Sequence, residues 1–229
     1  MESKALILGG HSGIGMAAAQ LLHQKFPEIE QCVPEKMILD VRSRSETIAC
    51  IQQEGPFTHI IYSAGVNKLS WIDNPRLGVI MNEMMTVNCY GFLDILTHHT
   101  HNFPGHEFSA VAVSSDAGRI PMRGSVAYGV SKAALNMVVK VAARELAPIV
   151  RVNAVAPGMV EDTAMTRYID DNIPIFRGWT PDYAEEYERQ GTPTGRRATK
   201  DEVAEAIVWL LTGPTQMTGV ILDVNGGRL

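Results

Sequence analysis

Short apolar segments alternate along the chain with longer segments whose apolar residues recur at helical spacing. The short segments are rich in Val, Ile, Leu and Ala, which is typical of strands buried on both faces. The predicted strands are Lys4–Leu8, Ile29–Val33, Met37–Val41, His59–Tyr62, Ser109–Ser114, Val150–Ala154 and Gly219–Val224. The predicted helices are Ile14–Lys25, Ser45–Gln53, Val79–His99, Ala127–Leu146 and Lys200–Leu211. This alternation predicts an α/β fold with a doubly wound parallel sheet flanked by helices.

The second crossover of this predicted sheet is too short. Only Pro34, Glu35 and Lys36 separate the second predicted strand from the third. A connection between parallel strands needs about a dozen residues or more, usually a helix. We therefore expect the helix between these two strands to be missing and one of the strands to be vestigial or out of register.

The stretch 159–199 lacks a clear pattern and is rich in Pro, Gly and charged residues. An irregular segment this long inside a compact domain is usually functional. We interpret it as a substrate lid within a single domain that spans residues 1–229.

Composition excludes several classes of protein. The 229 residues are 45% hydrophobic and 20% charged, and the formal net charge is −5 with scattered Lys and Arg, which argues against nucleic-acid binding. No run of about 18 apolar residues and no signal peptide is found, so no membrane is expected. The three cysteines form no C-x-x-C pair. We expect a cytoplasmic protein that needs no disulfide.

Glycines cluster directly after the first predicted strand, in the run Gly9-Gly10-His11-Ser12-Gly13-Ile14-Gly15. Glycines at a strand-to-helix turn let the backbone approach a pyrophosphate, and the free N–H groups of the helix start favour the anion. A plain tight turn is the alternative. Because the turn follows the first strand of an α/β pattern, we predict dinucleotide binding there.

Tyr128 and Lys132 stand four residues apart at the start of an apolar helix, so their side chains share one face. An ammonium group beside a phenol favours the phenolate, and we expect Lys132 to lower the pKa of Tyr128. Chance spacing of an ordinary Tyr and Lys is the alternative. Ser115 follows a predicted strand, at the sheet edge where ligands collect in open α/β folds.

Together these motifs resemble the short-chain dehydrogenase/reductase superfamily, in its compact single-domain branch with a Rossmann-like fold, over essentially the whole chain. The resemblance lies in the glycine turn, Leu39-Asp40-Val41, Tyr62-Ser63-Ala64-Gly65, Val87-Asn88-Cys89-Tyr90-Gly91, Val113-Ser114-Ser115, Tyr128-x-x-x-Lys132, Asn153–Gly158 and Asn225-Gly226-Gly227. Three departures stand out: Leu8 replaces a family Thr, Tyr62-Ser63 replaces Asn-Asn, and an extra residue precedes Thr163. We expect the turn to be softer than usual.

The resemblance implies an oxidoreductase that interconverts an alcohol and a carbonyl with NAD(P)(H). Tyr128 would exchange the proton, Lys132 would lower its pKa and hold the ribose, Ser115 would bind the substrate oxygen, and Asn88 would support Lys132 through water. The implied cofactor contacts are Gly9, His11, Ser12, Gly13, Ile14, Gly15, Asp40, Val41, Ser63, Ala64, Gly65, Tyr128, Lys132, Pro157, Gly158, Val160 and Thr163. The alternatives are a non-catalytic nucleotide sensor on the same fold and an epimerase or dehydratase of the extended branch.

The choice between NAD and NADP rests on conflicting residues. Glu35 stands where an acid would bind the ribose 2′-hydroxyl of NAD, whereas Lys36 would favour the 2′-phosphate of NADP. Because His11 and Ser12 also suit a phosphate, we favour NADP(H) slightly. The substrate is a small carbonyl or alcohol compound, and acyl thioesters, steroids, sugars and quinoid compounds fit equally well.

Two further expectations concern metals and assembly. His98, His99 and His101 lie at a predicted helix end without a carboxylate partner, so we assign no metal. The family resemblance and the wide apolar stripe of Ala127–Leu146 predict a homo-oligomer, a dimer or more readily a tetramer. The two-fold interface would centre on this helix and Val79–His99.

Overall fold

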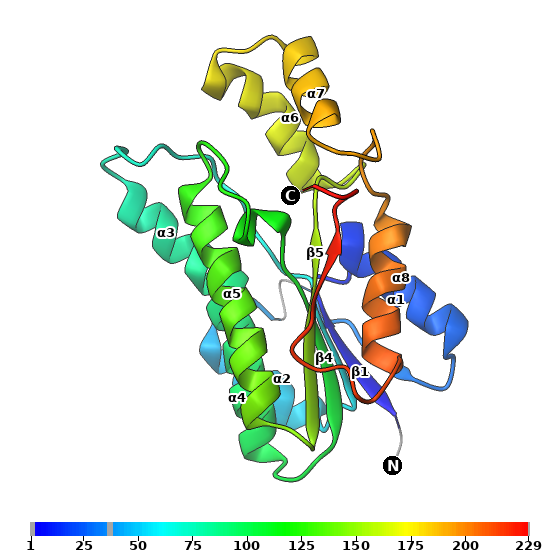
Figure 1. The fold of residues 1–229 in the computed structure, drawn as a ribbon. Helices are drawn as coiled ribbons and strands as arrows, with labels where there is room; N and C mark the ends of the chain where they lie inside the picture. Colours follow the sequence, from blue (N-terminus) through cyan, green and yellow to red (C-terminus); the bar gives the residue numbers. More distant parts are fainter. Residues whose placement is uncertain (1–2, 36–38, 229) are drawn as a thin grey trace.

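The computed structural model describes residues 3–35 and 39–228. Its centre is a parallel sheet of six strands in the order β2-β1-β3-β4-β5-β6, with helices on both faces (Figure 1). This Rossmann-like α/β architecture confirms the predicted fold class. The strands are β1 (Lys4–Leu8), β2 (Glu30–Cys32), β3 (His59–Tyr62), β4 (Phe108–Val113), β5 (Val150–Pro157) and β6 (Ile221–Val224).

Each face of the sheet has its own helices and core. On one face lie α1 (Gly13–Lys25) and α8 (Lys200–Thr212), packed on a cluster that includes Ile7, Val111 and Val155. On the other lie α2 (Arg44–Glu54), α4 (Gly91–Asn102) and α5 (Val126–Glu145). α5 is long and apolar enough to cross a membrane, yet its Leu135, Val139 and Ala143 are buried against the sheet. We therefore assign it to the core.

The predicted strand Met37–Val41 is wrong in its described part, and the connection from β2 to β3 contains α2. No helix lies between β2 and Leu39 in the described positions 33–35, and Leu39–Val41 forms no strand. Leu39 instead packs into the core, and Asp40 accepts a turn hydrogen bond from Ser43 N at 2.7 Å. Residues 36–38, with Lys36 and the start of the predicted third strand, lie outside the described residues. The chain returns to the sheet through α2.

The long predicted helix Val79–His99 is three elements. α3 (Leu77–Met85) runs into a π-helical turn at Thr86–Tyr90 and then into α4. Helical spacing in the sequence predicts the whole rod but not the extra residue that a π-turn contains. Such turns are frequent at functional sites, and this one contains Asn88.

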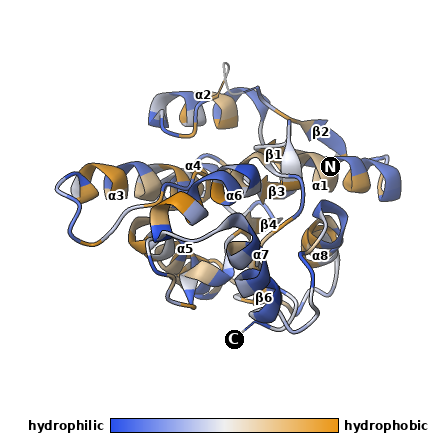
Figure 2. Cartoon of the chain, turned by 90° about the horizontal axis from the view of Figure 1, so that it is seen from above, coloured by the Kyte–Doolittle hydropathy of each residue, from blue (hydrophilic) through white to orange (hydrophobic). Residues whose placement is uncertain are grey.

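The predicted irregular lid was wrong in its secondary structure. Residues 159–199 contain α6 (Ala164–Arg177) and α7 (Pro181–Gln190), which stand above the carboxyl ends of the strands (Figure 1). Thr163 and Thr180 cap the two helices by accepting hydrogen bonds from backbone N–H groups, and Pro181 starts α7. Seen from above, α7 is mostly hydrophilic (Figure 2). α7 has no buried residues, so its sequence lacks the apolar stripe by which a helix is predicted.

Candidate active site

The carboxyl ends of the strands surround a cavity of about 880 Å³. Of the expected site residues, only Gly15 and Asn88 do not line it. The lining includes Gly9, His11, Ser12, Gly13, Ile14, Asp40, Val41, Ser63, Ala64, Gly65, Ser115, Tyr128, Lys132, Pro157, Gly158, Val160 and Thr163. Segments that follow β1, β3 and β4 and the end of β5 therefore meet at one place, as the Rossmann-like topology requires.

The glycine turn is shaped by backbone packing. Gly9 has a positive φ of 77°, and a side chain on Gly15 would overlap the Gly9 carbonyl. Gly15 thus acts from beneath the turn and keeps it close to α1. Ser12 is the N-cap of α1 but its side chain makes no cap hydrogen bond. The turn presents open backbone and a helix N-terminus to the cavity, which fits a pyrophosphate.

Ser115 and Tyr128 face each other across the cavity wall. Ser115 ends the segment after β4, Tyr128 lies in the first turn of α5, and both are 8% exposed. Burial raises the pKa of Tyr128 to about 12, although a hydrogen bond with Ser115 acts in the opposite direction. The nearby Asp116 carboxylate raises this pKa further, so the expected lowering of the pKa of Tyr128 by Lys132 is wrong for this structure.

Lys132 is 3% exposed, and its Nζ donates a hydrogen bond to Val113 O at 2.8 Å. The ammonium lies 5.7 Å from the ring centre of Tyr128. Burial lowers the pKa of Lys132 to about 8. A cation that is so poorly hydrated can donate hydrogen bonds strongly to hydroxyl groups that enter the cavity.

Asn88 lies behind this wall and is fully buried. Its Nδ2 donates to Val66 O and to Ser131 Oγ, both at 2.9 Å, and its Oδ1 accepts from Val66 N at 2.8 Å. Asn88 therefore ties the π-turn to α5 and to the loop after β3. A side chain on Gly65 would lie within 3.7 Å of both Asn88 Oδ1 and Lys132 Nζ. The Asn88 amide is thus close to the ammonium without touching the main cavity.

Tyr62 is a positioning residue that the sequence analysis did not identify. It stands where the family has Asn, is fully buried, and its hydroxyl donates to Val87 O at 2.5 Å. Val87 precedes Asn88 in the π-turn, where carbonyl groups lose their ordinary helical partners. Gly91 leaves the room for this hydroxyl, because a side chain there would overlap it. The Tyr-for-Asn departure was the available signal.

One end of the cavity carries several charged side chains. Asp40, one of the implied cofactor contacts, binds Arg42 Nε through its carboxylate at 2.9 Å and 3.0 Å. Glu35 and Arg42 both line the cavity. His11 Nε2 lies 3.0 Å from Val33 O, which places His11 beside the end of β2.

The opposite end of the cavity is formed by residues that no motif had indicated. Asp116 follows Ser115 and is 3% exposed, and Arg228 approaches it at 3.8 Å. Trp179 lines the cavity. Trp71 stacks on Phe176 with 4.6 Å between the ring centres, and this contact joins α6 to the loop before α3. The further lining residues on this side include Met122, Met165, Ile169, Ile173, Arg177, Tyr187 and Glu188.

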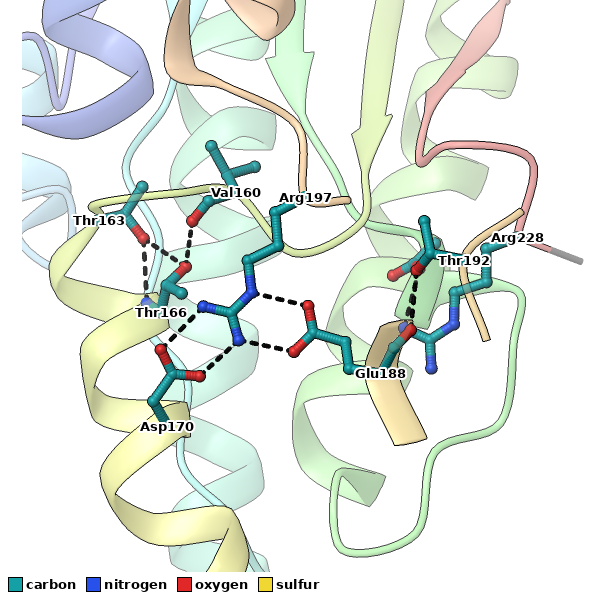
Figure 3. A network of polar contacts seen from close by, with 9 residues as sticks. Val160, Thr163, Thr166, Asp170, Glu188, Thr192, Arg197 and Arg228 are labelled. Atoms are coloured by element: carbon teal, nitrogen blue, oxygen red, sulfur yellow. Dashed lines mark hydrogen bonds and ion pairs between the residues drawn. The ribbon is translucent and has the colours of Figure 1, made fainter. Parts of the chain in front are cut away.

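Arg197 joins α6 to α7. Its guanidinium binds Asp170 of α6 at 2.7 and 2.9 Å and Glu188 of α7 at 2.7 Å through each of two nitrogens (Figure 3). Thr163 and Thr166 form a second set of hydrogen bonds at the start of α6 (Figure 3). Thr163 also lies beside Gly13, so α6 begins beside the glycine turn.

Comparison with known proteins agrees with this geometry. A family model described as Enoyl-(Acyl carrier protein) reductase matches residues 39–228. An uncharacterized oxidoreductase of Mycobacterium tuberculosis is 36% identical over 99% of this chain and 92% of its own length. The vibriobactin-specific 2,3-dihydro-2,3-dihydroxybenzoate dehydrogenase of Vibrio cholerae is 28% identical over 99% of this chain and 96% of its own length. Other relatives are 38–40% identical over segments that cover only 43–44% of their length.

Solved structures agree with the fold over its full length. A short chain dehydrogenase family protein from Francisella tularensis superposes with a TM-score of 0.86 at 25% identity, covering 99% of this chain and 98% of that one. The chain belongs to the short-chain dehydrogenase/reductase superfamily and is an NAD(P)-dependent oxidoreductase of that superfamily.

Proposed function

We propose that this enzyme interconverts an alcohol and a carbonyl, with Tyr128 as the acid and base. The observation that carries the proposal is the convergence of Ser115, Tyr128 and Lys132 on the cavity that the glycine turn borders. NAD(P)(H), when bound, supplies or accepts the hydride. The substrate oxygen would lie between the Ser115 and Tyr128 hydroxyl groups, and the proton would pass through the phenol.

Lys132 and Asn88 would support this step. In the proposal the Lys132 ammonium donates to the nicotinamide ribose and stabilises the phenolate of Tyr128 once substrate and cofactor exclude water. Asn88, through its bonds to Val66 and Ser131, holds the π-turn and α5 together and links Lys132 to solvent through water. A non-catalytic sensor would need the cofactor site but not these buried polar groups.

Replacement of Tyr128 by Phe tests the proposal. The ring still fills its place, so Tyr128→Phe should bind NAD(P)H as the wild type does, while turnover falls about 100-fold or more because the transferable proton is lost. Tyr90→Phe is the matched control, since Tyr90 is exposed. Cofactor affinity is measured by fluorescence titration. Turnover is measured with a panel of carbonyls and alcohols. Undiminished turnover by Tyr128→Phe would refute the proposed role, and a wild type that binds cofactor without turnover would support the sensor.

We also propose that NADP(H) is preferred slightly over NAD(H). Ser12 offers a hydroxyl without a cap bond, and Arg42 brings a cation to the same end, whereas Glu35 opposes a 2′-phosphate. Glu35→Gln should therefore raise the ratio of NADPH to NADH affinity, with Glu28→Gln as an exposed control. Titration of both reduced cofactors checks this, and tighter binding of NADH by the wild type would contradict it.

We propose, in addition, a single domain with α6 and α7 as its substrate lid, a cytoplasmic location and a homodimer or homotetramer. Exposed apolar side chains support the assembly on α3, α4 and α5, namely Val79, Leu93, Val130, Met137 and Val141. Met137→Lys should then break the assembly and lower activity, whereas Ile175→Lys on α6 should not. Light scattering that shows a fully active wild-type monomer would reject the oligomer.

A further inference from the structure

Asp116 presents a buried carboxylate oxygen that lacks a hydrogen-bond donor. The residue is 3% exposed and lines the main cavity. Its Oδ1 accepts a hydrogen bond from Ser115 Oγ at 3.2 Å. Among the described residues, no donor forms a hydrogen bond with Oδ2. An unfilled acceptor of this kind is costly in a folded protein, so the site is suited to a donor from a ligand.

Arg228 compensates the charge of Asp116 without filling this acceptor. The distance from Arg228 Nη1 to Asp116 Oδ2 is 3.8 Å, which is an ion pair but too long for a hydrogen bond. Arg228 lines the same cavity. The nearby guanidinium disfavours a second cation, so an ammonium group on the ligand would be repelled. A neutral hydroxyl can donate to Oδ2 without this repulsion.

The position of Asp116 relative to Ser115 indicates where the hydroxyl would stand on the substrate. Ser115 binds the reacting oxygen in the proposed function, and Asp116 is the next residue and is bonded to it. In the proposed geometry the Asp116 carboxylate therefore lies beside the reacting oxygen, where it would face the next carbon of the substrate. Gly158 borders Oδ2 without a side chain: a Cβ there would lie 3.5 Å from it. The absence of a Gly158 side chain leaves space beside this buried oxygen at the end of β5.

We propose that Asp116 binds a second hydroxyl group of the substrate, on the carbon next to the reacting one, and so selects vicinal diols and α-hydroxy carbonyls. Simple alcohols, and acyl thioesters with a methylene group at that position, offer no donor and leave Oδ2 unfilled. This inference rests on the proposed function, because Ser115 must hold the reacting oxygen.

The test compares cis-1,2-cyclohexanediol with cyclohexanol as substrates that differ by one hydroxyl. A hydrogen bond to a charged group corresponds to a preference of about 10- to 100-fold in kcat/KM for the diol. Asp116→Ala should abolish this preference, and Asp116→Asn, which keeps one acceptor oxygen, should reduce it. Both substrates need Ser115, so any loss of kcat/KM that a variant causes for both of them cancels in the ratio of the diol value to the cyclohexanol value. Asp171→Asn, on the exposed side of α6, is the matched control and should leave the ratio unchanged.

Three outcomes decide the matter. A wild type that uses both substrates equally, or a preference that survives Asp116→Ala, overturns the inference while the proposed function stands. Tyr128→Phe that turns over normally overturns the proposed function. If neither compound is oxidised, calorimetry on the enzyme loaded with NADP⁺ compares the affinities for the diol and for cyclohexanol. Tighter binding of the diol that is lost in Asp116→Ala supports the role of Asp116, and equal binding of the two compounds overturns it.

Discussion

The two helical faces of the sheet are stabilised in different ways. In the described residues of α1 and α8, no buried side chain is polar or charged, and the face is closed by residues such as Leu22, Ile207 and Leu210. The face formed by α4 and α5 buries Asn88, Ser131 and Lys132 with hydrogen bonds to each of them. One face thus supplies stability by apolar burial, and the other gives up some apolar area in order to position chemical groups.

Leu210→Ala should give the largest change in stability and should separate the two faces. Leu210 is 1% exposed on α8, so its truncation should lower the free energy of unfolding by about 2–5 kcal/mol. Turnover at a temperature where the variant is folded should stay near the wild-type value, because no site residue lies in α8. Denaturant unfolding and turnover measure the two effects. Ile175→Ala, at an 83% exposed position, is the control. Strong loss of turnover in folded Leu210→Ala would show that the faces are coupled.

His99 should make the stability of the polar face depend on pH. It is fully buried on α4, Phe57 N donates to its Nε2 at 2.9 Å, and burial lowers its pKa to about 4. Between about pH 6.5 and pH 4 the unfolded chain binds a proton that the folded protein does not. The free energy of unfolding should therefore fall by up to about 3 kcal/mol as the pH drops through this range.

His99→Gln tests this dependence. The variant should be less stable at neutral pH but should lose less stability on acidification than the wild type. His101→Gln, at an exposed position of the same helix, is the control and should follow the wild-type slope. Denaturant titrations from pH 4 to pH 7 provide the measurement. Parallel slopes for His99→Gln and the wild type would assign the acid sensitivity to other groups.

Tyr62→Phe should lower kcat even though the Phe ring still fits the apolar core. Removal of the hydroxyl leaves Val87 O in the π-turn without its donor, which costs about 1–3 kcal/mol of stability. Because Val87 precedes Asn88, kcat should also fall about 10-fold, while cofactor affinity stays within about twofold. Tyr183→Phe, half exposed on α7, is the control. A variant that loses stability but keeps its kcat would limit Tyr62 to a structural role.

Arg197→Gln should give the smallest effect and concerns the lid alone. The guanidinium joins α6 to α7 through Asp170 and Glu188, but its partly exposed ion pairs contribute little to global stability. We expect KM for the substrate to rise a few-fold, with kcat and the free energy of unfolding nearly unchanged. Arg196→Gln removes a comparable pair with Glu202 outside the lid and is the control. Equal KM values for the two variants would argue against a joint action of the lid helices.

The strands, the flanking helices and the family could be predicted from the sequence because each depends on local patterns. Apolar runs mark buried strands, glycines mark the turn after β1, and Tyr128 and Lys132 share a helical face by spacing alone. The short link after Val33 likewise indicated that the second and third predicted strands could not both pair in the sheet, and Leu39–Val41 forms no strand. The lid helices could have been recognised from Thr163, Thr180 and Pro181, which are ordinary helix-start signals.

The remaining features depend on contacts between distant segments, which no local pattern contains. The sequence by itself determined the α/β order, the family and the candidate acid and base. Tertiary structure decided that burial raises the pKa of Tyr128, since this shift depends on how completely the walls exclude water. It also decided that Tyr62 contacts the π-turn 25 residues away and that Asp116, in the middle of the chain, meets Arg228 near its last residue. Hydration and long-range pairing exist only when the whole sheet has formed, and they determine how the site residues act.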